Sequence, residues 1–542
     1  MSKVEKIKKN SNYLRGTLSN SLVNNVTGAL AEDDQMIVKF HGSYQQDDRD
    51  RRSERAKKKL EKLYSFMLRL RIAGGVISAK EWLGIDEIAT KYANETIKVT
   101  TRQTVQLHGI IKSNLKPTIA TFDKFGMDSI AACGDVNRNV MSSTIIAKSK
   151  AYDEVYEIAK EISDHLLPQT NAYNEIWLDD EKISPDKEEE TLYKETYLPR
   201  KFKISIAIPP SNDVDVYAHD VGLVAIIQDK ELLGFNVIIG GGMGRTHGNA
   251  ETFARVGDLV GFIKKEQILE AIYQIATIQR DYGNRQDRAK SRFKYTIDKY
   301  GVEWFKSEFS TRFGKPFEES HNFELTKRGD YYGWDEDYKG QYHYVQYVEN
   351  GRITGKLREL LFLIAKDNLA NFRFSNNQNI IISDILESNK AKVEAIISRL
   401  KINNDLTPIR LDAIACVALN TCSLALAEGQ RYLPSLISKI EDILAKNDLK
   451  EEPISIRMTG CPNGCGRPYL ADIGLVGRSM GKYDLMLGGD NLGTRLNRIY
   501  KESLAEEQIL NELGEIFHKF SLRDDKSQNF SNWQLKNINY DK

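Results

Sequence analysis

An internal repeat constrains the fold of this chain more than any other feature of its sequence. Residues 75–111 and 351–383 both begin with Gly-x-Ile, continue through a helical pattern that carries an Ile-Ala pair, and end in a strand. A polar turn of that strand carries Gln103 in the first copy and Gln378 in the second. Related halves pack about a pseudo-two-fold axis, and a ligand on that axis meets equivalent strands from both sides. The repeat therefore predicts one large ligand between two halves; two unrelated units that share common local patterns are the alternative.

The match between the two copies extends to a cysteine in each. The string IAAC ends at Cys133, four residues before Asn137, and the string IAC ends at Cys416, four residues before Asn420. This alignment predicts that Cys133 and Cys416 are equivalent. Because Cys133 has no second thiol nearby in the sequence, we interpret it as a degenerate repeat position and not as a ligand.

Four of the five cysteines form two local pairs, Cys416-x5-Cys422 and Cys461-x3-Cys465. Paired thiols in a chain without signs of secretion favour a metal site over disulfides. The glycines around Cys461 and Cys465 let the backbone turn sharply and direct N–H groups inward, as the sulfurs of an iron–sulfur cluster require. Zinc sites use shorter spacings, C-x2-4-C, which the first pair does not match. A [4Fe–4S] cluster is the preferred interpretation, with zinc or four structural cysteines as the alternatives.

The overall charge excludes some classes of partner. The 542 residues include 77 basic and 76 acidic side chains, a formal net charge of +1, which favours neither nucleic acid nor a membrane surface as a partner. The sequence contains no apolar run of membrane-spanning length, and the N-terminal segment has no apolar signal core. Reduced thiols also belong in a reducing compartment, so we expect a cytoplasmic protein. A basic run, RDRRSERAKKK, covers residues 49–59.

Cations recur on segments that are otherwise apolar or strand-like. A buried cation needs an anionic partner, and a tetrapyrrole with many carboxylates or a small oxyanion would provide one. No glycine loop matches the dinucleotide fingerprint, so we expect no nicotinamide or flavin site in this chain. The cations concerned are Arg69, Arg71, Arg102, Arg138, Lys201, Lys203, Arg288, Lys290, Arg292 and Lys294.

Long motifs identify a family resemblance that covers about residues 55–520. They include LRLRIAGGVIS, TTRQTVQLHGI, YLPRKFKISIAIPP, GFNVIIGGGMG, ACVALNTCSLALAE and TGCPNGCGRPYLADIGLVG. The chain resembles the sirohaem-containing sulfite and nitrite reductases, and within them the haemoprotein (beta) subunits of assimilatory NADPH-sulfite reductases. The resemblance implies an α+β fold with internally repeated ferredoxin-like halves about a pseudo-two-fold axis and two larger α/β lobes.

We expect five parts along the chain. They are a polar, extended N-terminal arm (1–52), the first ferredoxin-like half (53–125), a sirohaem and substrate lobe (126–340), the second half (341–401), and a cluster lobe with a polar tail (402–542). The arm and the tail after Ser521 depart from the family pattern, so we expect them to be candidate contacts for a partner protein.

The resemblance also implies roles for individual residues. Cys416, Cys422, Cys461 and Cys465 would bind the [4Fe–4S] cluster, and Cys465 would also be the proximal ligand of the sirohaem iron. Arg69, Arg138, Lys201 and Lys203 would bind and protonate the substrate. Contacts to the sirohaem are implied at Arg71, Arg102, Gln106, His108, Gly241, Gly242, Arg292 and Gln378.

The implied reaction is the six-electron reduction of sulfite to sulfide for assimilation into cysteine. The implied electron donor is an NADPH-dependent flavoprotein (alpha) subunit, with a ferredoxin as the runner-up. A nitrite reductase of the same superfamily is the alternative enzyme, and similar nitrite reductases carry Asn where this chain has Lys203. A non-catalytic metal-binding or cluster-scaffold protein is the alternative from another class.

Overall fold

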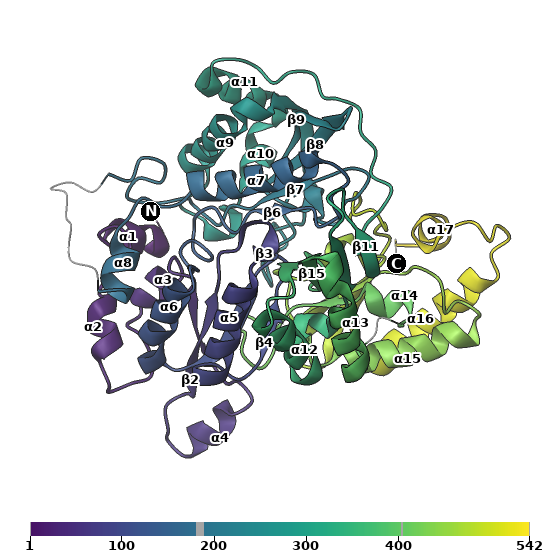
Figure 1. Cartoon of the computed structure of the whole chain (residues 1–542), viewed down its shortest axis with the longest axis horizontal. Helices are drawn as coiled ribbons and strands as arrows, with labels where there is room; N and C mark the ends of the chain where they lie inside the picture. The colour runs from purple at the N-terminus through teal and green to yellow at the C-terminus, as the bar shows by residue number, and fades with distance from the viewer. Residues whose placement is uncertain (1, 180–188, 403–404, 541–542) are drawn as a thin grey trace.

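The computed structural model describes residues 2–179, 189–402 and 405–540, and it contains four five-stranded sheets. Figure 1 shows the chain passing from the first half, in purple and teal, to the second half, in green and yellow. Within the described residues, no helix is both long and apolar enough to cross a membrane.

The first two sheets are built alike and exchange a strand. Sheet I has the order β1-β2-β5-β4-β13 and sheet II the order β11-β12-β15-β14-β3, and every neighbouring pair is antiparallel. Sheet I comprises β1 (Ser43–Asp47), β2 (Tyr64–Arg69), β5 (Val105–Ile110), β4 (Ile97–Val99) and β13 (Arg352–Ile353); sheet II comprises β11 (Gly333–Glu336), β12 (Tyr342–Gln346), β15 (Ile380–Ile385), β14 (Asn371–Phe374) and β3 (Val76–Ile77).

This strand exchange links the two halves through backbone hydrogen bonds. The second repeat contributes β13 to the edge of sheet I, and the first repeat contributes β3 to the edge of sheet II. Strands β1 and β11 lie outside the bounds expected for the halves, 53–125 and 341–401. Each half therefore depends on the other to complete its sheet.

Helices α5 (Ala79–Lys91) and α12 (Gly355–Lys366) follow the exchanged strands in their respective halves and pack against each other near the centre of the molecule (Figure 1). Ser78 caps α5 through a capping box with Glu81, which satisfies two otherwise unpaired backbone donors. Trp82, Ile85 and Ile88 are fully buried. The apolar spacing along these helices accounts for the packing.

The other two sheets also share one topology. Sheet III runs β6-β7-β8-β9-β10 and sheet IV runs β16-β17-β18-β19-β20; in each, three parallel strands are followed by two antiparallel ones. The strands are β6 (Met141–Ser142), β7 (Ile204–Ala207), β8 (Val221–Gln228), β9 (Glu231–Ile239), β10 (Asp258–Lys264), β16 (Ile414–Ala415), β17 (Ile456–Thr459), β18 (Ile473–Ser479), β19 (Lys482–Leu487) and β20 (Arg498–Leu504).

The remaining long helices cover these sheets. Those of the first lobe are α7 (Lys150–His165), α9 (Ile268–Tyr282), α10 (Phe293–Tyr300) and α11 (Val302–Phe313), and those of the second are α15 (Leu433–Lys446) and α16 (Glu506–Ser521). Helices α6 (Leu115–Lys124) and α13 (Glu387–Leu400) belong to the ferredoxin-like halves. One apolar core runs through sheets I, II and III, and a second core fills the lobe of sheet IV.

The register of the strands corrects the alignment of the repeats at the cysteines. Gln103 donates a hydrogen bond to the carbonyl of Ser142 (2.7 Å), and Gln378 donates the equivalent one to Ala415 (3.1 Å). Ser142 and Ala415 are therefore equivalent, and Cys416 corresponds to Ser143. The expected equivalence of Cys133 and Cys416 is wrong, because short IAC-like strings recur by chance while the strand register does not.

The N-terminal segment is folded, contrary to the expected extended arm. It contains α1 (Lys3–Lys9), α2 (Leu18–Val23) and α3 (Asp34–Ile37), and Leu14, Leu18 and Phe40 are buried in the core. These apolar residues follow no regular period, so the sequence pattern did not indicate packing. The charge of buried Lys8 is compensated by Glu5 and Asp135.

The expected polar tail also contains a packed helix, α17 (Phe530–Asn537). Phe530 and Trp533 are buried, and both rings lie against Phe520. Two aromatic side chains one turn apart are enough to anchor this short helix in the second lobe.

Candidate catalytic and cofactor site

The four paired cysteines lie in loops at one edge of sheet IV. Cys416 follows β16 directly and Cys461 comes two residues after β17, and these strands are parallel neighbours. Burial, followed by the neighbouring Cys465 thiol, raises the pKa of Cys416, of Cys422 and, to about 12, of Cys461. The Cys465 thiol therefore lies close enough to the other three thiols to act on each of them. In the described chain, no group of three His, Cys, Asp or Glu side chains is arranged to hold a single metal ion. A cluster of several irons holds its ligands farther apart than one ion does, so four separated thiols suit a cluster better than a single ion.

Backbone N–H groups point at the thiols, as the glycine-rich loops predict. Gly460 donates to the sulfur of Cys416 at 3.3 Å. The backbone N–H groups of Leu424 and Ala425 act on Cys422, and that of Asn463 acts on Cys461. Such donors stabilise thiolates and tune the potential of an iron–sulfur cluster. The residues present fit the cluster expected from the cysteine spacing.

The predicted substrate cations come together in the first half. Arg138 lies beside the Lys201–Lys203 segment, where its backbone N–H donates to the carbonyl of Phe202 at 2.9 Å. Arg69, on β2, reaches the loop of Arg138 and donates to the sulfur of Cys133 at 3.2 Å. Cys133 therefore lines the cation group, which we name the cation pocket and define as Arg69, Arg102, Arg138, Lys201 and Lys203.

The cation pocket adjoins Cys465. Burial, followed by Arg200 and Arg292, lowers the pKa of Lys201 well below the ordinary lysine value, and the Cys465 thiol opposes this effect. Burial, followed by Lys201 and Arg102, likewise lowers the pKa of Lys203, again opposed by Cys465. Both lysines nevertheless keep part of their surface accessible. Both side chains therefore lie close to Cys465 and stay partly accessible.

No ion pair within the described chain involves any member of the cation pocket. Burial and the neighbouring Arg138 lower the pKa of Arg102 to about 9, and its Nε and Nη1 atoms are buried without a hydrogen-bond partner. Buried cations without carboxylates need anions from outside the chain. These orphaned nitrogens fit the carboxylates of a sirohaem and a substrate oxyanion.

The loop of Gly241 and Gly242 closes this region from the side of sheet III. A Cβ atom at Gly241 would lie 2.2 Å from the carbonyl oxygen of Tyr217, so only glycine fits. The following residues contact the cysteine loop, where the N–H of Arg245 donates to the carbonyl of Pro462 at 2.9 Å. The glycines therefore allow sheet III to approach the Cys461–Cys465 loop closely.

Four of the other expected residues lie around the same site. Gln106 on β5 lies opposite Arg69 on β2. With its side-chain amide turned so that the oxygen faces Arg69, Gln106 accepts hydrogen bonds from the Arg69 guanidinium. His108 is buried and contacts Gln46 at 3.1 Å, and burial followed by Arg352 lowers its pKa well below the ordinary value. Arg292 is paired with Asp220 at 2.8 Å, and Gln378 contacts the residue before Cys416.

Arg71 lies apart from these residues. Its guanidinium pairs with Asp128 at 2.7 Å and with Asp164 at 2.6 Å. Two protein carboxylates already compensate its charge. The structure therefore does not bring Arg71 together with the cation pocket.

Asn139 and Asp220 are site residues that the sequence analysis missed. Asn139 donates to the carbonyl of Arg102 at 2.9 Å and accepts from the N–H of Ile72 at 2.7 Å, so it fixes the strand loop that carries Arg102. Asp220 holds Arg292. In the sequence, only the Asn-Arg-Asn string at residues 137–139 pointed to a role for Asn139. Nothing in the sequence pointed to Asp220, because a single Asp before a strand is common.

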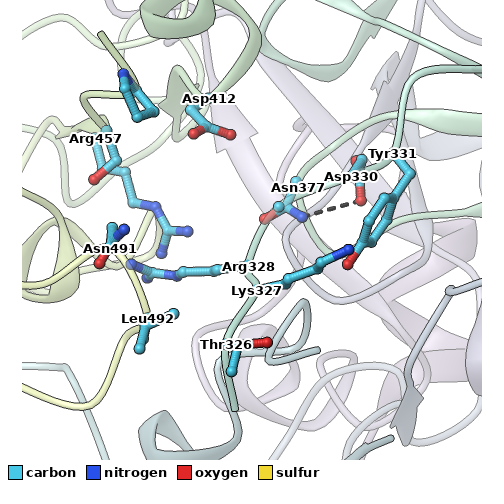
Figure 2. A pocket seen from close by; sticks show the side chains of 13 residues that line it. Thr326, Lys327, Arg328, Asp330, Tyr331, Asn377, Asp412, Arg457, Asn491 and Leu492 are labelled. Carbon is cyan, nitrogen blue, oxygen red and sulfur yellow. Dashed lines mark hydrogen bonds between the residues drawn. The ribbon is translucent and has the colours of Figure 1, made fainter. Parts of the chain in front are cut away.

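A pocket beside the second half contains other cations, Lys327, Arg328 and Arg457, but has no cation at the positions equivalent to Lys203 and Arg102 (Figure 2). The cavity, of about 230 Å³, is lined by Asn377, Asp412, Ser455 and Arg457 among others. By strand register Ser455 corresponds to Lys203, and Asn377 corresponds to Arg102. The two halves have diverged: the first supplies the cations and the second supplies the thiols.

Substituting Gly241 by alanine is expected to disturb the site. The added methyl group would clash with the carbonyls of Tyr217 and His219 and push the loop away from Cys461–Cys465. We expect Gly241→Ala to lower the cofactor content of purified protein by at least about tenfold, the range seen when supporting residues of metal sites are changed. Absorbance and iron analysis measure this. Gly514→Ala, in α16 with nothing closer than 4.0 Å, is the matched control, and equal losses in both variants would contradict the proposed role of the loop.

Two family descriptions match the chain. "Nitrite/Sulfite reductase ferredoxin-like half domain" matches residues 58–124, and "Nitrite and sulphite reductase 4Fe-4S domain" matches residues 157–317. The second segment contains none of the five cysteines. The four paired cysteines lie in the lobe of sheet IV, which repeats the topology of sheet III.

Curated relatives match along nearly the whole chain. "Sulfite reductase [NADPH] hemoprotein beta-component" of Leptospira biflexa is 56% identical over 525 residues and covers 95% of both chains. The protein of the same description from Staphylococcus saprophyticus is 48% identical and covers 99% of this chain and 95% of its own. The solved structure of the Mycobacterium tuberculosis NirA protein superposes with a TM-score of 0.81 at 23% identity over 98% of this chain and 95% of that chain, which confirms the fold. The chain belongs to the sulfite reductase hemoprotein beta-component family within the nitrite and sulfite reductases.

Proposed function

We propose that this protein reduces sulfite to sulfide in a six-electron reaction, and that Cys465 would help to hold both a sirohaem and a [4Fe–4S] cluster. One observation carries the proposal: the Cys465 thiol influences the pKa of the other three paired thiols and also the pKa of Lys201 and Lys203. When bound, the coupled cofactors supply electrons one at a time to one substrate atom. The chain itself binds, orients and protonates the substrate.

Four cations of the cation pocket would act on the oxyanion. The guanidinium groups of Arg69 and Arg138 suit planar pairs of oxygen atoms, and they stabilise the negative charge that develops on oxygen when an S–O bond breaks. Lys201 and Lys203 have lowered pKa values, so each gives up its proton more readily than an exposed lysine does. These lysines are the proposed proton donors.

The remaining residues would hold the cofactors. Cys416, Cys422, Cys461 and Cys465 would bind the cluster, and Arg102 would pair with a sirohaem carboxylate. Gln106, His108, Arg292, Gln378 and the Gly241–Gly242 loop would complete the cradle. Arg71 is not assigned a role in this proposal, because Asp128 and Asp164 already neutralise it.

We propose an NADPH-dependent flavoprotein subunit as the electron donor, supported by the names of the relatives. A ferredoxin is the second candidate. Nitrite is the alternative substrate, and Lys203 supports sulfite because the additional cation suits the greater negative charge of that anion. Five free cysteines support a reducing, cytoplasmic location.

The visible spectrum of purified protein and turnover with one artificial donor test this function together. We expect a Soret band coupled to the cluster, with faster turnover of sulfite than of nitrite. A colourless protein that contains zinc would overturn the proposal. A coloured protein that prefers nitrite would keep the cofactors and change the substrate.

A further inference from the structure

Asp215 and Arg467 occupy equivalent positions in the two halves. Ile204 of β7 pairs with Val221 of β8, and Ile456 of β17 pairs with Ile473 of β18. Asp215 lies six residues before Val221, and Arg467 lies six residues before Ile473. Both adopt left-handed backbone angles, with φ of 50° and 54°, and each precedes a short 3-10 turn.

These two equivalent residues contact each other. The Nε of Arg467 donates to the carboxylate of Asp215. The two ends of the Arg467 guanidinium then donate to the carbonyls of Thr101, at 3.0 Å, and of Asn376, at 3.2 Å. Thr101 and Asn376 are themselves equivalent, because each lies two residues before the paired glutamines Gln103 and Gln378. The Asp215–Arg467 pair therefore lies at the pseudo-two-fold axis and joins both halves there.

The Asp215–Arg467 pair is buried, and two further arginines surround its carboxylate. Asp215 has no exposed surface and Arg467 retains 4%. Asp215 also accepts from Arg328 and from Arg457, each at 2.7 Å, so three guanidinium groups converge on one carboxylate. Removing one member of such a network leaves buried charge uncompensated. The position of the Arg467 side chain is therefore fixed by its contacts with Asp215, Thr101 and Asn376.

Thr101 connects this network to Cys465. Its hydroxyl donates to the carbonyl of Cys465 at 2.9 Å, while its own carbonyl accepts from Arg467. Arg467 is two residues after Cys465. Thr101 therefore holds the cysteine loop at two points, Cys465 and Arg467. Thr101 directly precedes Arg102 of the cation pocket.

We propose that the Asp215–Arg467 pair is a positioning device for Cys465 that fixes the thiol between the cluster and the cation pocket. This inference rests on the proposed function, in which Cys465 is the shared ligand. Neither Asp215 nor Arg467 touches the reacting atoms. Both act through the backbone that carries the thiol, and their contact across the axis gives both halves a shared reference point.

Arg467→Lys is the principal test. Lysine keeps the positive charge beside Asp215, but one ammonium group cannot reproduce the planar fork that reaches Asp215, Thr101 and Asn376 together. We expect normal iron and tetrapyrrole content, kcat lowered about 10- to 100-fold with KM for sulfite unchanged, and altered magnetic coupling between haem and cluster in EPR and Mössbauer spectra. Asp215→Asn is expected to give the same spectroscopic change.

Asp86→Asn is the matched control. Asp86 on α5 pairs with Arg358 on α12, so this variant also removes a carboxylate–arginine pair between the two halves. It is expected to lower stability without changing coupling or kcat. Wild-type coupling and kcat in Arg467→Lys, or the same spectral change in Asp86→Asn, would overturn the inference.

Thr101→Val keeps the test decisive if the charged variants do not fold. It removes only the hydroxyl that binds the Cys465 carbonyl and keeps the side-chain volume. A smaller change of coupling in the same direction supports the inference. Wild-type coupling in Thr101→Val together with unfolded Arg467→Lys would assign the pair to stability alone and overturn it. Wild-type protein without a coupled haem and cluster would instead refute the proposed function.

Discussion

Cys465→Ser is expected to abolish sulfite turnover and the coupling between the haem and the cluster. A serine hydroxyl is a poor ligand for iron in a cluster that prefers soft thiolates, and the proposed bridge needs one atom bound to both centres. Cys465 is also the thiol that influences all three other cysteines. Loss of this thiol should therefore affect both cofactors at once, which absorbance, EPR and turnover with an artificial donor measure.

Cys133→Ser is the control for this variant. Cys133 is fully buried, contacts Arg69 and lies outside the group of four thiols. A serine oxygen can still accept from Arg69, so the spectrum should remain that of the wild type. If Cys465→Ser keeps a coupled spectrum, or if Cys133→Ser loses it, the assignment of the shared ligand is wrong.

Lys203→Asn is expected to lower kcat/KM for sulfite by about 10- to 100-fold while the absorption spectrum stays unchanged. A hydrogen bond to a charged group contributes ~1.5–3 kcal/mol, which corresponds to that range. Asparagine keeps a polar donor but removes the positive charge and the transferable proton. We also expect turnover of nitrite to fall less than turnover of sulfite, because nitrite carries less negative charge.

Lys482→Asn, an exposed substitution at the start of β19, is the control for the chemical change. It should leave both activities unchanged. Loss of the tetrapyrrole in Lys203→Asn would show that Lys203 holds the cofactor and not the substrate. Equal losses with both anions would remove Lys203 as the residue that distinguishes them.

The repeated fold explains why the site is asymmetric. Both halves present the same strand ends to the axis, but the position of Lys203 is Ser455 in the second half, and the position of Cys416 is Ser143 in the first. A symmetric cradle can hold one large planar ligand, while each half specialises in a different chemical task. Divergence of a few side chains on one duplicated framework is sufficient for this.

Much of the site could be predicted from the sequence because its signals are local. The spacing of Cys416, Cys422, Cys461 and Cys465 and the glycines between them lie within short loops, where covalent reach brings the residues together. The cations on strand segments were identifiable for a similar reason, since charge within an apolar pattern is unusual. The packing of the N-terminal segment was not predictable, because Leu14, Leu18 and Phe40 form no periodic face and find their partners only in the folded core.

Arg71 shows where the sequence misleads. It lies in the same motif as Arg69, yet its charge is compensated by Asp128 and Asp164, residues far along the chain. Ion pairs between distant segments leave no trace in local spacing. The same applies to Asp220, whose carboxylate holds Arg292 across 72 positions.

The sequence by itself indicated the duplicated architecture, the four candidate thiol ligands and the candidate cations, because periodicity and spacing encode contacts between near neighbours. Only the tertiary structure decided which cations share the site with Cys465, how the two repeats align at Cys416, and that Asp215 meets Arg467 at the axis. The alignment at Cys416 rests on hydrogen bonds between residues 39 and 37 positions apart, and Asp215 and Arg467 meet across 252 positions. Such contacts are set by the burial of whole sheets against one another and not by any local pattern.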